Sequence, residues 1–193
     1  MKKVKFKLLF LLQFVLISGI FSQDKVGVID FERIRGEVYQ RHQLEQFYQS
    51  LVDTLDRFAK QKVVAFQNKY LSDYRIIEEM SNKQQLALQD TIRSFEERFK
   101  SYEAFFNEGL PASIGQLDMA LMRAVNGYLN DYAPEHDYRL VLFKSNLIYF
   151  EKDLEITEDI LPEIMTEKEI NQVVLAWKQG LLAEGDRQME RVK

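Results

Sequence analysis

The sequence predicts an α+β fold, mainly α, in which a small β-rich body carries a long antiparallel helical hairpin. Among 193 residues there are only 8 Gly and 3 Pro, so few positions are available for tight turns. Apolar residues recur at alternating spacings of three and four through the middle of the chain. Short β-rich runs come before and after this helical stretch, which places a small body at its base.

The first 22 residues are predicted to be a secretory signal peptide. Lys2, Lys3, Lys5 and Lys7 precede an apolar run over residues 8–21. A helix needs roughly 20 apolar residues to cross a bilayer, so this run is short for an anchor and typical of an export signal. We place the cleavage site after Ser22, and an uncleaved membrane anchor is the alternative.

Composition and charge exclude several classes of function. The chain has no cysteine, which excludes disulfides and thiolate metal sites. Removal of the first 22 residues with their four lysines changes the formal charge from −4 to −8. No basic patch indicates nucleic-acid binding, and the net charge gives no reason to expect contact with anionic lipid. His42 and His136 have no partner at metal-ligand spacing, and no phosphate loop or nucleophile motif occurs. We therefore expect no enzyme activity, no cofactor and no metal.

Residues 25–31 are predicted to form the first body strand, and the hairpin arm follows over residues 33–131. Polar residues 81–83 interrupt the apolar pattern, which places the tip of the arm near residues 80–84. The stretches before and after this interruption have equal lengths, so the second helix should bring the chain back to the body from which the first one starts. Pro111 cannot donate to the helix ladder and is expected to kink or break the returning helix.

The C-terminal third is predicted to complete the body. Residues 138–150 contain two further β-rich runs separated by turn-compatible residues 144–146. A short helix is expected over residues 157–165, with Thr157 as its cap. Residues 166–193 are predicted to be an amphipathic helix with Trp177 on its apolar face, followed by a polar tail. We expect this helix to pack on the body, and a docking element for another envelope protein is the alternative.

Aromatic residues are the main candidates for a binding surface, since the chain contains 14 Phe and 9 Tyr. Those on the apolar stripes of the arm either fill the hairpin seam or face a bound partner, and the sequence leaves both roles open. The candidates are Phe66, Tyr70, Tyr74, Phe95, Phe99 and Tyr102. Phe47 and Phe105 lie beside the stripes. Because a two-helix unit encloses only one stripe from each helix, we predict that these two residues meet another subunit or a bound partner.

Four segments together resemble a known family. Residues 26–31 form an opening strand, and Pro111 with Ala124 and Val125 marks a returning helix. Residues 138–143 form a closing strand, and residues 156–160 begin a short helix. In this order, behind a signal peptide, they resemble the Skp/OmpH family of periplasmic outer-membrane-protein chaperones over residues 23–165.

The resemblance implies a jellyfish-like homotrimer in the periplasm, whose arms hold unfolded outer-membrane proteins in a cavity without ATP. Val26, Val28, Val141 and Phe143 are then the candidates for the trimer body. The mature chain is acidic, unlike the well-known family members, which removes the basis for expecting contact with lipid or lipopolysaccharide. Residues 166–193 extend beyond the usual end of the family. The alternative function is a coiled-coil envelope scaffold or adaptor that binds a specific folded partner.

Overall fold

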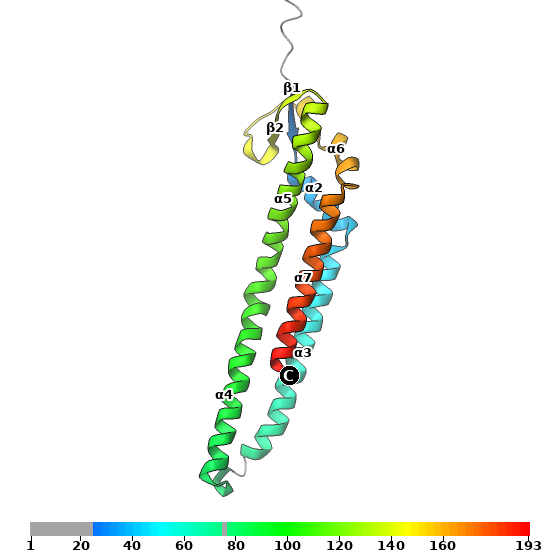
Figure 1. The fold of residues 1–193 in the computed structure, drawn as a ribbon. Helices are drawn as coiled ribbons and strands as arrows, with labels where there is room; N and C mark the ends of the chain where they lie inside the picture. The colour runs from blue at the N-terminus through cyan, green and yellow to red at the C-terminus, as the bar shows by residue number, and fades with distance from the viewer. Residues whose placement is uncertain (1–24, 75–76) are drawn as a thin grey trace, which may run out of the picture.

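The computed structural model describes residues 25–74 and 77–193 and confirms the mainly α, α+β fold. A small body stands at one end of an elongated molecule, and a long helical arm extends from it (Figure 1). The predicted signal peptide, residues 1–22, lies outside the described residues. The main elements are β1 (Lys25–Ile29), α2 (Phe31–Arg41), α3 (Leu44–Tyr74), α4 (Asn82–Ala104), the π-helical turn η2 (Phe105–Gly109), α5 (Leu110–Glu135), β2 (Tyr138–Phe143), α6 (Thr157–Ile164) and α7 (Lys168–Val192). Short 3₁₀ turns are η1 (Ile77–Glu79), η3 (Lys144–Asn146) and η4 (Lys152–Leu154).

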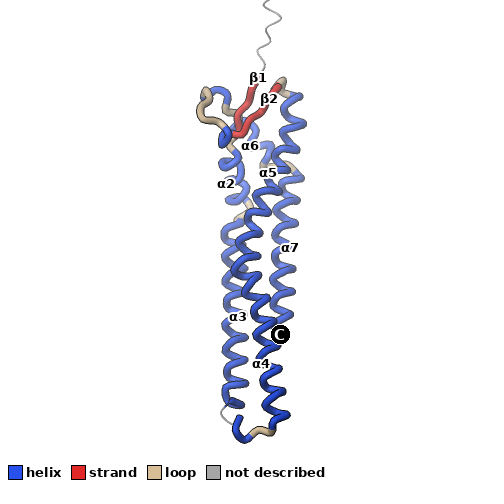
Figure 2. Tube along the Cα trace, turned by 90° about the vertical axis from the view of Figure 1, so that its left-hand side faces the viewer, coloured by secondary structure: helices blue, strands red, loops and turns tan. Residues whose placement is uncertain are grey.

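The helix α7 runs back along the upper half of the arm and contacts α3, α4 and α5 (Figures 1 and 2). The upper arm is therefore a bundle of three helices, and only the lower arm is a two-helix hairpin. The predicted polar tail is wrong, because α7 continues to Val192, whose side chain is only 2% exposed. Leu181 and Val192 are eleven residues apart, which is about three helical turns, so both lie on the face that meets the arm.

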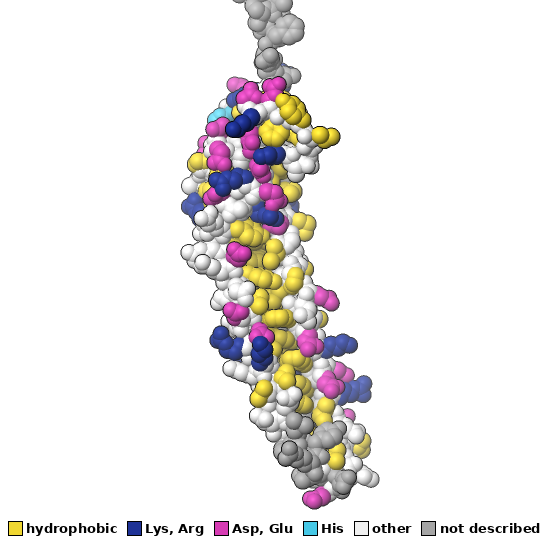
Figure 3. All heavy atoms as spheres, turned by 180° about the vertical axis from the view of Figure 1, so that it is seen from behind, with side chains coloured by type: hydrophobic (Ala, Val, Ile, Leu, Met, Phe, Trp, Pro, Cys, Tyr) yellow, Lys and Arg dark blue, Asp and Glu magenta, His cyan; other side chains and the backbone are white. Residues whose placement is uncertain are grey.

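The arm is a hairpin in which α3 leaves the body and α4, η2 and α5 return to it (Figure 1). Apolar side chains at helical spacing on both halves meet along one seam. Figure 3 shows these side chains as a stripe that follows the seam on the face opposite α7. The seam is thus partly open to solvent along that face.

At the tip of the arm, α4 begins at the predicted interruption. Ser81 caps α4: its hydroxyl accepts from the N–H of Gln84 at 3.4 Å, and the side chain of Gln84 accepts from the N–H of Ser81 at 2.9 Å. This reciprocal pair satisfies two backbone donors at the start of the helix. A polar residue that can cap therefore fixes where α4 starts.

The predicted break at Pro111 does not occur, since helical structure continues from Asn82 to Glu135. Instead, η2 widens the helix directly before the proline, and the N–H of Leu110 donates to the carbonyl of Phe105. A π turn shifts the bonding by one residue, which gives the proline ring room beside the preceding turn. A different break, between α2 and α3, was not predicted. It falls at Gln43, whose φ of 51° lies in the left-handed region.

The body contains two parallel strands, with Val28 opposite Leu142 and Ile29 opposite Phe143. On the other side of β1, the N–H of Ile156 donates to the carbonyl of Val28 at 2.9 Å. The strand predicted over residues 147–150 is wrong. These residues form an irregular loop in which Ile148 is fully exposed. An apolar run becomes a strand only where a neighbouring strand can form backbone hydrogen bonds with it.

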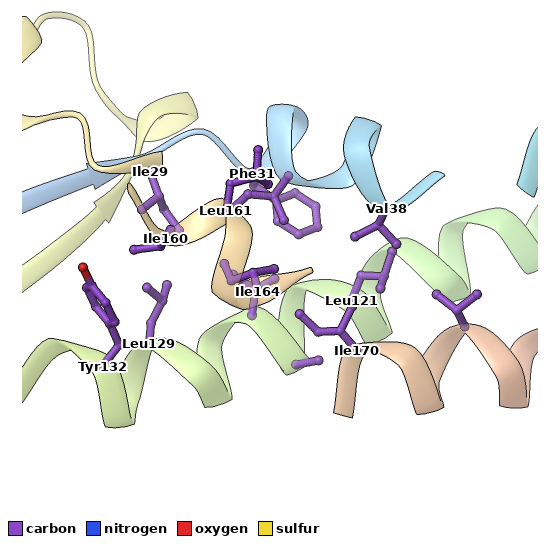
Figure 4. Close-up of a cluster of buried hydrophobic side chains, with 14 of the residues drawn as sticks. Ile29, Phe31, Val38, Leu121, Leu129, Tyr132, Ile160, Leu161, Ile164 and Ile170 are labelled. Atoms are coloured by element: carbon purple, nitrogen blue, oxygen red, sulfur yellow. The ribbon is translucent and has the colours of Figure 1, made fainter. Parts of the chain in front are cut away.

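The body core joins both strands to α2, α5, α6 and the first turns of α7 (Figure 4). Its fully buried members include Ile29 from β1, Ile160 and Ile164 from α6, and Ile170 from α7. The cap predicted at Thr157 is wrong: its buried hydroxyl accepts from the N–H of Asp30 at 2.8 Å and so ties α6 to the start of α2. The core therefore fixes the direction in which the arm leaves the body.

Candidate functional site

An aromatic ladder lies between the two halves of the arm. We use this name for the partly or fully buried rings of Phe66, Tyr70, Phe95, Phe99, Tyr102 and Phe106. Phe66 of α3 stacks on Phe95 of α4, with ring centroids 3.9 Å apart and planes at 13°. The stacking then continues along α4 and into η2, where the centroid distances are 5.6 Å for Phe95–Phe99, 5.8 Å for Phe99–Tyr102 and 6.5 Å for Tyr102–Phe106.

The ladder thus contains five of the six predicted arm residues, and the side chain of the sixth, Tyr74, lies outside the described residues. Only Tyr102 is fully buried, at 2% exposure, while Phe66, Tyr70, Phe95 and Phe99 keep part of their surface open to solvent. These rings pack in the seam and keep part of their surface accessible. An aromatic surface of this kind can contact an apolar chain without giving up the packing that holds the arm together.

Tyr102 anchors the ladder to α3. Its hydroxyl donates to the carbonyl of Leu55 at 2.5 Å inside the seam, one turn from where its ring meets Phe58 at 6.0 Å. Burial, with a smaller contribution from the charge of Asp56, raises the pKa of Tyr102 to about 12. The phenol therefore stays protonated and keeps donating across the physiological range.

A shallow hollow of about 180 Å³ opens beside the ladder. Ala59, Phe99 and Phe106 form its apolar walls, and Asp56 and Glu103 stand at the same opening. The small side chain of Ala59 leaves the space, because larger residues occupy most other positions on this stripe of α3. The hollow has room for an aliphatic side chain of a bound polypeptide but not for a cofactor.

The aromatics beside the stripes are covered by α7 of the same chain. Phe47 meets Trp177 edge to face at 5.7 Å, and the indole N–H of Trp177 donates to the carbonyl of Ser113 at 2.9 Å. Lys178 donates to the carbonyl of His42 at 2.7 Å and lies 5.1 Å from the ring of Phe47. Burial, and then the charge of Lys178, lower the pKa of His42.

Phe105, the second aromatic beside the stripes, lines a hollow of about 380 Å³ together with Trp177 and Leu181. Phe47 and Phe105 both lie against α7 of the same chain, which supplies a third helix that encloses a second stripe. Contact of these two residues with another subunit or a bound partner is therefore not required by the packing, and it stays a prediction. The sequence contained a signal for this contact in the apolar face around Trp177.

The lower arm has no such cover. The end of α7 shares a hollow of about 200 Å³ with Phe66 and Phe95, which marks the level where the third helix stops. Two large apolar side chains of the lower arm are open to solvent, Val64 at 52% and Leu86 at 62%. The periodicity of the sequence does not indicate either residue, since both lie off the apolar stripes.

The four trimer-body candidates lie in the two-stranded sheet. Val28 is 1% exposed, and Val141 and Phe143 pack against the body core of their own chain, where Phe143 meets Phe31 at 6.2 Å. Val26 is partly buried. The open apolar residues of the body are others, which the sequence analysis missed: Leu140 at 49%, Ile148 at 108% and Tyr149 at 81%.

Within residues 25–74 and 77–193, no group of three or more histidine or carboxylate side chains is placed to hold a metal ion. No helix in that part of the chain is long and apolar enough to span a membrane.

Replacement of Tyr102 by Phe tests how the ladder is anchored. The change leaves the carbonyl of Leu55 without this donor, so the free energy of unfolding should fall by about 1 kcal/mol in urea titrations at pH 7. The folded pKa is raised, so the stability from Tyr102 is complete below about pH 10 and is lost as the pH rises through about 12. The difference between the two proteins should shrink over that range. Met119→Leu, at an exposed position of α5, is the control, and equal stability of all three proteins at pH 7 would contradict this role.

The family comparison agrees with this architecture. The model of the family described as outer membrane protein (OmpH-like) matches residues 25–164, from the first residue of β1 to the last residue of α6. It covers the body and both halves of the arm, and α7 lies outside it. A search of the curated proteins found no match to the chain. Because the family model spans well over half of the sequence, and the fold agrees with the resemblance found in the sequence, the chain belongs to the OmpH-like outer membrane protein family.

Proposed function

We propose that this protein is an ATP-independent periplasmic holdase, which binds unfolded outer-membrane proteins on its arm and prevents their aggregation. The observation that carries the proposal is the partly exposed aromatic ladder on an arm that stands clear of the body, in a chain of the OmpH-like family. The predicted signal peptide supports export to the periplasm.

The chemistry of the clients fits such a surface. Outer-membrane strands alternate apolar and polar residues and carry aromatic residues at both membrane interfaces. An unfolded strand can therefore offer an apolar side chain at every second residue to the stripe along the arm. Each contact is weak, but several contacts on one arm hold the client through a high effective concentration and still release it without ATP.

We also propose that three copies assemble through the body. The two-stranded sheet is too small to be stable alone, and β2 has one neighbouring strand among the described residues. Leu140 on that strand and Ile148 and Tyr149 in the following loop are open apolar residues of the body, which a second copy would cover. Arms that extend from a shared body would then surround a common space.

A second candidate function is an envelope scaffold that binds one folded partner. The close stacking of Phe66 on Phe95 favours it, because much of the ladder surface is already used inside the seam. The two functions differ in one measurable respect: a scaffold has no general affinity for unfolded chains.

The holdase proposal predicts suppression of aggregation. When a urea-unfolded outer-membrane β-barrel is diluted into buffer without ATP, the mature protein should lower light scattering and saturate near one trimer per client. The double variant Val64→Ser/Leu86→Ser, at exposed sites of the lower arm, should need about tenfold more protein for half suppression, since two apolar contacts are lost.

The matched control is Leu175→Ser/Leu182→Ser, which removes two similarly exposed apolar side chains from α7. This control should behave as the wild type. No suppression by wild-type protein that is shown to be folded would reject the holdase and leave the scaffold as the better account.

The trimer proposal predicts a mass of three chains in sedimentation equilibrium. Leu140→Glu places a charge among the open apolar residues of the body, so it should raise the concentration for half dissociation at least about tenfold. Met119→Glu, at a position of α5 with 57% exposure, is the control and should stay trimeric. A monomeric wild type at micromolar concentration would rule the assembly out.

A further inference from the structure

The helix α7 covers an apolar surface that is continuous with the aromatic ladder. Leu181 and Val192 of α7 share one buried cluster with Leu51 and Leu55 of α3. The ladder residues Phe95, Phe99 and Phe106 pack against the same cluster. The covered surface and the open ladder thus have the same aliphatic and aromatic chemistry. The difference between them is that α7 shields the covered surface from solvent.

The two halves of α7 are held differently. The first half enters the body core through Ile170 and Val174 and makes hydrogen bonds to the arm through Trp177 and Lys178. In the second half, the ion pair of Arg187 and the hydrogen bond of Gln188 both go to Glu184 of α7 itself. The second half is therefore attached to the arm mainly by apolar contacts, which are short-range and reversible.

The boundary between these halves is Gly180. Apart from its chain neighbours and the backbone of its own helix, no atom lies within 4 Å of the position that a Cβ would take there, so packing does not require glycine. Glycine in a helix interior costs about 1 kcal/mol relative to alanine and makes bending easier. The 380 Å³ hollow adjoins the same residue, which leaves the helix without close support at this level. Farther along the helix, Oε1 of Gln188 is buried without a hydrogen-bond partner. This unpaired oxygen weakens the packing of the second half of α7 against the arm.

We propose that residues 180–192 are a displaceable cover over a second client-binding surface, formed by Leu51, Leu55 and Phe105. The proposal rests on the holdase function above and names a further surface for the same clients. The second half of α7 bends away at Gly180, while Ile170, Val174 and Trp177 keep the first half in place. An apolar segment of the unfolded chain then takes the position of α7 and extends from the ladder into the upper arm.

A crosslink tests whether this cover has to move. The chain has no natural cysteine, so two can be introduced at chosen sites. Ala65 and Lys193 are exposed and line the same 200 Å³ hollow, and a short bis-maleimide between Ala65→Cys and Lys193→Cys would hold the end of α7 on α3. The matched control is Ala65→Cys/Thr91→Cys, which places the same reagent in the same hollow but joins α3 to α4.

Binding of a fluorescent, urea-unfolded outer-membrane β-barrel is then measured by anisotropy. The α7 crosslink should raise the apparent Kd about tenfold relative to the uncrosslinked protein. The reason is that the state with residues 180–192 displaced, which binds the client on the second surface, is no longer populated. The control crosslink should leave the Kd within about twofold. Equal binding by both crosslinked proteins, or equal weakening of both, would overturn the proposal while leaving the holdase function intact. If the uncrosslinked protein does not bind the client, the proposed function fails and this inference fails with it.

A second pair of variants keeps the test independent of the crosslink. Gly180→Ala stiffens the boundary of the two halves, fits the open space there and should weaken client binding about fourfold. Gly115→Ala is the control, since Gly115 of α5 also has open space beside it, and its client affinity should not change. On adding client, hydrogen exchange of residues 180–192 should accelerate in wild type and less so in Gly180→Ala. Unchanged protection of α7 in the client complex would contradict the displacement.

Discussion

Two packed helices can enclose one apolar stripe from each partner, and the upper arm of this protein carries more apolar side chains than that. The structure meets this constraint with a third helix. Trp177 covers Phe47, and the turn of α7 at Gly185 lies close to Leu51 and Leu55, so these side chains are buried inside the upper arm. The lower arm keeps only the seam, and its remaining apolar surface is open to solvent. The division between a closed upper arm and an open lower arm follows from where α7 ends.

The body and the arm are one packed unit. Ile170 and Val174 at the start of α7 lie in the body core, and the next turns of the same helix hold both halves of the arm through Trp177 and Lys178. Within the body, the hydroxyl of Thr157 accepts from the N–H of Asp30 and ties α6 to the junction of β1 and α2. The direction of the arm is therefore set by buried contacts.

Much of this fold could be predicted from the sequence. The mainly α class and the polar interruption at Ser81 follow from periodicity and capping residues, which act locally. The sequence also pointed to the aromatic stripe: Phe95 and Tyr102 share one cluster, and Phe66 stacks on Phe95. Whether a ring faces the seam or solvent depends on the rotation of both helices, and the partly exposed rings of the ladder do both.

The features that could not be predicted depend on distant partners. Gln43 adopts a left-handed backbone without a glycine to mark it, and η2 absorbs Pro111 without a break. Residues 147–150 look like a strand, but no neighbouring strand pairs with them in the described chain. Phe47 and Phe105 looked unpartnered because their cover lies more than 70 residues later in the sequence, at Trp177.

The central claim is that unfolded chains bind on the arm and not on the body. Site-specific photocrosslinking tests it most directly, with a benzoylphenylalanine at Leu86 of the lower arm or at Ile148 of the body, both of which are exposed. The account predicts crosslinks to an unfolded outer-membrane β-barrel from position 86, and crosslinks to a second copy of the protein from position 148. Client crosslinks from position 148 alone, with none from position 86, would contradict it.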